Sequence, residues 1–214
     1  MKSTLKEIEE RFDQDVARFS NIDTGQQTTI DALFNMELIT QGIAAVYPNL
    51  KSVLDIGCGA GNYPVMLASK SNNFDCTLVD LSQPMLDKAF ERVSQSTNGN
   101  VETRKGDFRS IDLPKAGFEV IIATAVLHHL RDDEDWKDSF TKLYSLLKSG
   151  GSLWIFDMVM HESTKIQQLI YKNRYGNYLT SLKDANYRDH VFDYIEKEDT
   201  PQSLTYQIKK KKNV

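Results

Sequence analysis

The sequence predicts an α/β fold in which a doubly wound, mainly parallel sheet follows two N-terminal helices. Short apolar runs alternate with helical patterns through the middle of the chain, which is typical of such a sheet. Two of these runs, Val120-Ile121-Ile122-Ala123 and Leu153-Trp154-Ile155-Phe156, are continuously apolar, as strands buried on both faces should be. The earliest of the apolar runs, at residues 51–56, leads directly into a glycine-rich turn.

Two amphipathic helices are predicted at the start of the chain, over residues 3–18 and 27–46. The second carries apolar side chains at helical spacing, namely Ile30, Leu33, Phe34, Leu38 and Ala45. Pro48 is expected to close this helix, because proline cannot continue the helical hydrogen-bond pattern.

Five strands and three intervening helices are predicted after Pro48. The strands cover residues 51–56, 75–80, 101–105, 118–124 and 152–159. The helices cover residues 61–70, 82–95 and 132–148. The third strand begins Val101-Glu102-Thr103-Arg104, which is polar and is expected at a sheet edge. Gly150-Gly151 is expected to end the last helix and to turn the chain into the fifth strand.

The length of 214 residues suits a single domain. We expect it to consist of an N-terminal helical cap at 1–48, a cofactor-binding core at 49–160 and a helical substrate-side segment at 161–214. Apolar residues make up 40% and charged residues 26% of the chain, as in ordinary soluble enzymes. No apolar run approaches the roughly 18 residues of a membrane span. The charged N-terminus lacks the apolar stretch of a signal peptide.

Two cysteines, Cys58 and Cys76, offer neither a disulfide framework nor the spacing of metal ligands. The formal charge of −4 gives no general attraction to nucleic acid. These features predict a cytoplasmic protein without a membrane or metal partner.

The glycine-rich turn Asp55-Ile56-Gly57-Cys58-Gly59-Ala60-Gly61 is the first functional signal. Glycines at such a turn allow positive φ and let the backbone approach a ligand. The spacing is G-x-G-x-G, whereas nicotinamide enzymes use G-x-G-x-x-G. Asp55 would be awkward beside a pyrophosphate but suits a cationic ligand group.

Two further acids follow the next two strands. Asp80 ends an apolar strand, where a carboxylate can accept both hydroxyls of a ribose. Ser82 is expected to cap the helix that follows, and its first turn, with Met85, would lie beside the ligand. Asp107 and Phe108 follow the third strand and could meet an adenine amino group and ring. The carboxyl ends of parallel strands meet at one edge, so these acids predict a nucleoside site.

The run from Val53 to Met158 resembles the Rossmann-like core of class I S-adenosylmethionine-dependent methyltransferases. The resemblance implies that the glycine turn surrounds the methionine part of S-adenosylmethionine, that Asp80 holds the ribose, and that Thr124 faces the cofactor near its sulfonium. The cofactor-binding residues predicted in this way are Asp55, Gly57, Cys58, Gly59, Gly61, Asp80, Leu81, Met85, Asp107, Phe108 and Thr124. Structural roles stay open for four of them: helix packing for Gly61, and core packing for Leu81, Met85 and Phe108.

A looser resemblance links the chain to carboxy-S-adenosylmethionine synthase and its relatives. It is carried by Arg11-Phe12-Asp13-Gln14-Asp15-Val16 and by Arg188, which falls where the synthase keeps an arginine for the carboxylate of its cofactor. Gln27 stands where the synthase has a tyrosine near the cofactor, so the synthase chemistry is not carried over.

Adjacent histidines follow the fourth strand in Leu127-His128-His129-Leu130. Neighbouring residues on a turn rarely point at one ion, and no acidic or cysteine cluster completes a metal site. At least one histidine therefore has a structural role, while His128 is a candidate base. His128 and Arg188 are the candidate catalytic residues, and the catalytic group is otherwise unassigned.

The family usually completes its sheet with two further strands, and these are expected to be missing here. A homodimer that covers the fifth strand is one way to compensate for their absence.

The predicted function is methyl transfer to a small-molecule acceptor that sits under the N-terminal helices and the segment from His161 to Tyr194. This segment is rich in residues that suit a small polar or anionic metabolite: Tyr171, Arg174, Tyr175, Tyr178, Tyr187 and Arg188. Four alternatives stay open: modification of the tRNA wobble uridine, carboxy transfer to the cofactor, a noncatalytic module that binds S-adenosylmethionine, and a nicotinamide oxidoreductase.

Overall fold

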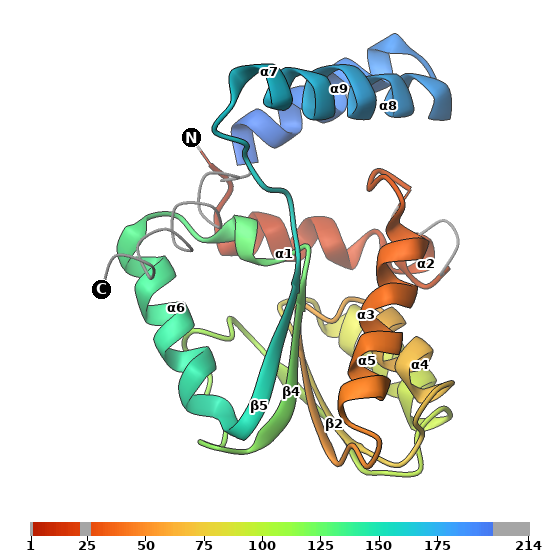
Figure 1. Cartoon of the computed structure of the whole chain (residues 1–214), viewed down its shortest axis with the longest axis vertical. Helices are drawn as coiled ribbons and strands as arrows, with labels where there is room; N and C mark the ends of the chain where they lie inside the picture. Colours follow the sequence, from red (N-terminus) through yellow and green to blue (C-terminus); the bar gives the residue numbers. More distant parts are fainter. Residues whose placement is uncertain (1, 22–26, 199–214) are drawn as a thin grey trace.

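A computed structural model describes residues 2–21 and 27–198 of the chain (Figure 1). Its centre is a five-stranded sheet in which all neighbouring strands are parallel, in the order β3-β2-β1-β4-β5. The strands are β1 Ser52–Ile56, β2 Asp75–Asp80, β3 Val101–Lys105, β4 Phe118–Thr124 and β5 Leu147–Phe156. The predicted α/β, doubly wound parallel fold is confirmed, and so is the edge position of the polar strand β3.

Helices cover both faces of the sheet (Figure 1). Three of them pack on one face: α3 Ala32–Val46, α4 Asn62–Ala68 and α5 Gln83–Ser94. The other face packs against α6 Asp133–Leu146, whose Trp136 and Leu143 are buried against Ile121 of β4. Burial on both faces explains the continuous apolar pattern of β4.

The N-terminal region differs from the single helix predicted over residues 3–18. Helix α1 Leu5–Asp13 begins with a capping box between Thr4 and Glu7, and α2 Val16–Phe19 follows after a break. At the break, the Asp15 carboxylate pairs with Arg18 at 2.5 Å. Aspartate favours helix ends over helix interiors, because its short side chain competes for local hydrogen bonds. The next helix, α3, starts five residues later than predicted.

Strand β5 begins at Leu147, so the expected role of Gly150-Gly151 as a helix stop is wrong. Leu147 pairs with Phe118, but the next pair joins Ser152 to Val120, so that β5 carries extra residues at this point. Gly150 has a φ of +78°, and a Cβ on Gly151 would lie 3.0 Å from backbone oxygens. The two glycines therefore allow an irregularity inside β5.

The C-terminal helices form a separate layer above the carboxyl edge of the sheet, reached from the end of β5 (Figure 1). They are α7 Thr164–Gln167, the π-helix η2 Gln168–Tyr175, α8 Gly176–Leu182 and α9 Ala185–Glu198. Leu179, Val191 and Ile195 form their small core. Within residues 2–21 and 27–198 the sheet ends at β5, and in that part of the chain no helix has the length and apolar character needed to span a membrane.

Candidate functional site

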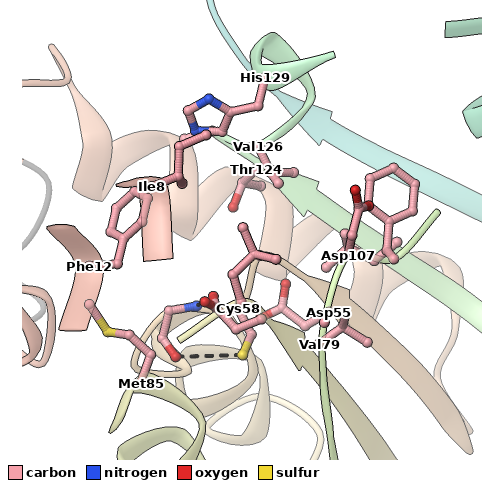
Figure 2. A pocket seen from close by; sticks show the side chains of 18 of the residues that line it. Ile8, Phe12, Asp55, Cys58, Val79, Met85, Asp107, Thr124, Val126 and His129 are labelled. Carbon is pink, nitrogen blue, oxygen red and sulfur yellow. Dashed lines mark hydrogen bonds between the residues drawn. The ribbon is translucent and has the colours of Figure 1, made fainter. Parts of the chain in front are cut away.

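The main pocket lies at the carboxyl edge of the sheet, where the connections from β1 and β4 run in opposite directions (Figure 2). Open α/β sheets bind their ligands at such a switch point, because the loops that diverge there leave a crevice. The pocket is lined by the loops after β1, β2, β3 and β4, and by α1 and α2.

The glycine turn after β1 forms the floor of the pocket. Gly57, Gly59 and Gly61 all have positive φ, at +63°, +50° and +76°. A Cβ on Gly57 would lie 2.7 Å from a methyl of Val126, whereas a Cβ on Gly59 would meet no protein atom within 4 Å. Because Gly59 lines the pocket, its missing side chain leaves room for a ligand.

Asp80 joins the glycine turn to the start of α5. One carboxylate oxygen accepts a hydrogen bond from the Gly59 N–H at 2.8 Å, and the other accepts one from the Ser82 N–H at 2.9 Å. Ser82 in turn caps α5 through the Met85 N–H, as predicted. Burial raises the pKa of Asp80, while the two backbone donors act in the opposite direction.

Asp55 lies beside Asp80 in the same pocket and is only 2% exposed. Burial, and secondarily the charge of Asp80, raises the pKa of the Asp55 carboxyl. Burial likewise raises the pKa of the nearby Cys58 thiol. Two carboxyls in one pocket, one buried and one partly buried, favour a cationic ligand, since a positive charge would stabilise their ionised forms.

Asp107 is held by an arginine that the sequence analysis did not select. Arg109 donates through Nε and Nη2 to the Asp107 carboxylate and also pairs with Asp135 of α6 at 2.7 Å. The charge-assisted fork fixes the Asp107 carboxylate at the rim of the pocket next to Phe108.

The predicted cofactor residues come together, with one exception. All of them except Gly61 line the pocket. A Cβ on Gly61 would lie 2.9 Å from Val93 and 3.2 Å from Ala89, so this glycine allows α4 to pack closely on α5. The individual ligand contacts of the other residues stay predictions.

Helices α1 and α2 supply an apolar wall of the pocket, formed by Leu5, Ile8, Phe12 and Phe19. The sequence analysis placed the acceptor under the N-terminal helices but did not name these side chains. Side chains from the elements that border the pocket hold this wall in place. Ser82 donates to the Asp13 carboxylate at 2.5 Å, Asn62 donates to the Phe19 carbonyl at 2.8 Å, and Lys105 pairs with Glu9 at 2.6 Å.

The two histidines after β4 have different surroundings. His128 does not line the pocket; its Nδ1 lies 2.7 Å from Asp157 at the end of β5, and its N–H donates to the same carboxylate. His129 lines the pocket, and its Nδ1 is buried without a hydrogen-bond partner. In the sequence, the signal for His129 was its position next to His128, which was selected as the candidate base.

Tyr63 of α4 is a second pocket residue that the sequence analysis did not select. Its hydroxyl is buried without a hydrogen bond of normal geometry, although Thr124 is close enough to influence it. Burial raises the pKa of Tyr63 to about 12, so it is a neutral phenol.

Arg188 and the aromatic residues of the C-terminal helices are not among the residues that line the pocket. Arg188 lies on α9 and pairs with its neighbour Asp189 at 2.7 Å. The aromatic rings pack on one another, with Tyr171 4.9 Å from Phe192, and the Tyr178 hydroxyl donates to the Gln27 carbonyl. The structure therefore does not bring Arg188 to the site.

Comparisons with known proteins agree with the fold. Residues 53–151 match a family model described as a methyltransferase domain. An uncharacterized methyltransferase of Mycobacterium tuberculosis is 33% identical over 107 residues, which cover 50% of each chain. A malonyl-acyl-carrier-protein O-methyltransferase of Paenibacillus is 23% identical over 155 residues, 72% of this chain and 55% of that protein. The chain thus spans about half the length of these curated relatives.

Two solved structures share the fold. The N-methyltransferase NodS of Bradyrhizobium japonicum, in complex with S-adenosyl-L-homocysteine, has a TM-score of 0.55 at 18% identity and covers 69% of this chain and 71% of its own. The cyclase SpnF has a TM-score of 0.61 at 15% identity, and the match covers 92% of this chain and 94% of the SpnF chain. At these identities the likeness shows the fold alone.

The fold and the position of the pocket are those of open α/β domains that bind ligands at the carboxyl edge of a parallel sheet. Residues 53–151 belong to the class I S-adenosylmethionine-dependent methyltransferase family.

Proposed function

We propose that this protein binds S-adenosylmethionine in the main pocket and transfers its methyl group to a small-molecule acceptor. The observation that carries the proposal is the pair of carboxyls in the pocket, the buried Asp55 and the partly buried Asp80, beside a glycine whose missing Cβ opens into the pocket. S-adenosylmethionine carries an ammonium and a sulfonium, and burial raises the pKa of both carboxyls, so that a cationic ligand would stabilise their ionised forms.

Each loop has a distinct part in this proposal. Asp80 would accept the ribose hydroxyls while the Gly59 and Ser82 N–H groups hold its carboxylate in place. Asp55 would face the cationic methionine part. Asp107, oriented by Arg109, would border the adenine. The bound cofactor would supply an electrophilic methyl group.

The apolar wall would exclude water from the reacting atoms. Leu5, Ile8 and Phe12 of α1 lie across the pocket from the strand ends. A closed, dry site in which the acceptor is held in line with the methyl group provides most of the rate enhancement that positioning can give.

Carboxy transfer, the alternative suggested by the looser resemblance, finds less support. An anionic cofactor group needs a cation, and among the described residues that line the pocket the cation is Arg109. Arg109 is engaged by both Asp107 and Asp135.

The test is calorimetric titration with S-adenosylmethionine and S-adenosylhomocysteine. Asp80→Asn keeps the shape of the side chain but removes its charge, and we expect binding to weaken at least about tenfold, which is about 1.4 kcal/mol. Asp75→Asn at the opposite end of β2 is the matched control and should bind as the wild type does.

Methyl transfer is measured separately, by incubating the protein with methyl-labelled S-adenosylmethionine and a small-molecule extract. Label in an extract component supports the proposal. Binding without any transfer would support the noncatalytic module instead, and a folded protein that binds neither cofactor would overturn the proposal altogether.

A further inference from the structure

Helix α1 presents different faces to two parts of the molecule. Leu5, Ile8 and Phe12 follow one another at helical spacing and line the main pocket. Figure 2 shows Ile8 and Phe12 across the pocket from Asp55 and Asp107. The chain just before α1, and another side of the same helix, contact α9 of the C-terminal layer.

Ser3 joins the start of α1 to the end of α9. Its N–H and its hydroxyl donate to the two oxygens of the Glu198 carboxylate, at 2.9 and 2.8 Å. The Ser3 carbonyl accepts a further hydrogen bond from the guanidinium of Arg131, which lies just before α6. Two charge-assisted bonds to one carboxylate fix both the position and the direction of the chain at this point.

Arg11 makes a second contact between the two helices. Its guanidinium carbon lies 4.8 Å from the ring centroid of Tyr194 on α9 and 4.9 Å from that of Phe12. A cation over two rings is a favourable arrangement, and here it connects a ring of α9 to a ring that lines the pocket. Because Ser3 meets Glu198 and Arg11 meets Tyr194, α1 and the last turns of α9 run antiparallel (Figure 1).

Glu198 is a buried and ionised partner for Ser3. It is 2% exposed. Burial raises the pKa of Glu198, but the hydrogen bonds from Ser3 and the pairing with Lys197 outweigh burial and lower this pKa to about 2. A buried carboxylate is costly without its donors, so the buried position of Glu198 depends on Ser3 remaining in place.

The C-terminal helices have little apolar attachment to the rest of the protein. In the part of the chain that the structure describes, their small core shares no buried residue with the two cores on the faces of the sheet. Other contacts of this layer are polar: the hydroxyls of Tyr175 and Tyr178 donate to the carbonyls of Thr28 and Gln27. A layer docked mainly through polar contacts separates from its support at a lower free energy than a core element does.

We propose that α1 is a lid over the cofactor pocket, and that its contacts with α9, made by Ser3 with Glu198 and by Arg11 with Tyr194, are the latch that keeps the lid closed. The proposal rests on the proposed function and assigns control of access to the same pocket.

The latch controls how often the lid opens. A ligand held between the strand ends and α1 is covered by Leu5, Ile8 and Phe12, so displacement of α1 widens its path to solvent. Displacing α1 from α9 breaks both bonds of Ser3 to Glu198. The fraction of molecules with an open lid is therefore set by the strength of the latch, and a weaker latch raises that fraction.

The first test measures opening of the lid in the ligand-free protein. Glu198→Gln keeps the shape of the side chain but removes its charge, so it weakens both hydrogen bonds from Ser3. We expect the backbone amides of α1 to exchange hydrogen for deuterium at least about fivefold faster in this variant, while those of β1 exchange at the wild-type rate. Mass spectrometry of peptides from the full chain reports both segments.

Glu196→Gln is the matched control, because it makes the same change on an exposed residue of α9. It should leave the exchange of α1 unchanged. Ser3→Ala removes the hydroxyl bond and keeps the N–H bond, so it should speed exchange in α1 by less than Glu198→Gln does. This variant leaves α9 itself unaltered, and it therefore separates the latch from any change within that helix.

The second test measures ligand traffic by stopped-flow mixing with S-adenosylhomocysteine. A lid that opens more often lets the ligand enter and leave faster, so both association and release should speed up by at least about fivefold in Glu198→Gln. The dissociation constant should change far less than either rate, as long as the closed lid remains the main state. Loss of a simple binding contact would speed release alone.

The outcomes separate the latch from the proposed function. The inference is overturned if α1 of Glu198→Gln exchanges at the wild-type rate, if Glu196→Gln has the same effect, or if release speeds up without association. A wild type that binds neither S-adenosylmethionine nor S-adenosylhomocysteine overturns the proposed function. In that case the exchange of α1 still decides whether Glu198 holds the helix.

Discussion

The backbone N–H of Gly59 donates a hydrogen bond to the Asp80 carboxylate at 2.8 Å. This bond joins the loops after β1 and β2, so the glycine that leaves space in the pocket also fixes the acid at its side. The second oxygen of Asp80 accepts from Ser82, whose hydroxyl reaches Asp13 of α1. The glycine turn, the start of α5 and helix α1 are thus connected through Asp80 and Ser82.

Gly59→Ala is expected to abolish cofactor binding without unfolding the protein. The new Cβ meets no protein atom but enters the pocket, and the φ of +50° costs about 1–2 kcal/mol for a residue with a side chain. Gly150→Ala is the matched control, because Gly150 also has positive φ and open space around its Cβ but lies in β5, outside the pocket. Both variants should lose similar stability in urea, and only Gly59→Ala should lose affinity. Equal affinities in calorimetry would contradict the assignment of the glycine turn.

Asp55→Asn is expected to change stability and S-adenosylmethionine binding in opposite directions at neutral pH. The raised pKa of Asp55 means that the folded state favours the protonated carboxyl. The stabilising effect of the protonated Asp55 carboxyl is present at pH values below its ordinary pKa of 3.8. It is lost as pH rises toward the pKa in the folded protein. The wild type should therefore become less stable relative to Asp55→Asn as pH rises above 4, while the variant binds S-adenosylmethionine more weakly. Urea midpoints of the two proteins from pH 4 to 8 check this, and parallel curves would speak against it.

His129 should give a pH dependence of the opposite sign. Its pKa falls from 6.5 to about 2 on folding, so the unfolded chain binds the proton more readily. The contribution of neutral His129 to the free energy of unfolding is fully present above pH 6.5. It declines as pH falls toward 2, by roughly 2 kcal/mol between pH 6.5 and pH 5. His129→Phe removes this dependence, and the difference between the two unfolding free energies should narrow as pH falls. A difference that is constant from pH 8 to 5 would show that His129 does not titrate in this way.

Ser82→Ala should lower the stability of the protein more than Asp13→Ala does, while both should speed the release of the cofactor product. Ser82 caps α5 and also donates to Asp13, whereas Asp13→Ala removes only the contact with α1. Loss of the cap should cost about 1 kcal/mol of stability in Ser82→Ala. Both variants loosen the α1 wall, so both should release bound S-adenosylhomocysteine faster in stopped-flow measurements. An unchanged release rate in Asp13→Ala would mean that α1 does not retain the cofactor.

Strand bounds were the most predictable part of the fold. The limits of β2, β3 and β4 coincide with those predicted, because each is a short run bounded by polar or turn residues. The start of β5 was not predictable in the same way. Its first residues are polar and glycine-rich, and they join the sheet only because Leu147 pairs with Phe118 across the irregularity.

The sequence by itself determined the α/β alternation, the glycine turn and the acids at the strand ends, because these depend on local periodicity and on the rule that parallel strands end at one edge. Only the tertiary structure decided that His129 and not His128 lines the pocket, that Arg109 holds Asp107, and which side chains of α1 line the pocket. The directions of adjacent side chains on a 3-10 turn depend on what packs around them. Asp157, which holds His128, is 29 residues away in the chain, and no local pattern contains that contact.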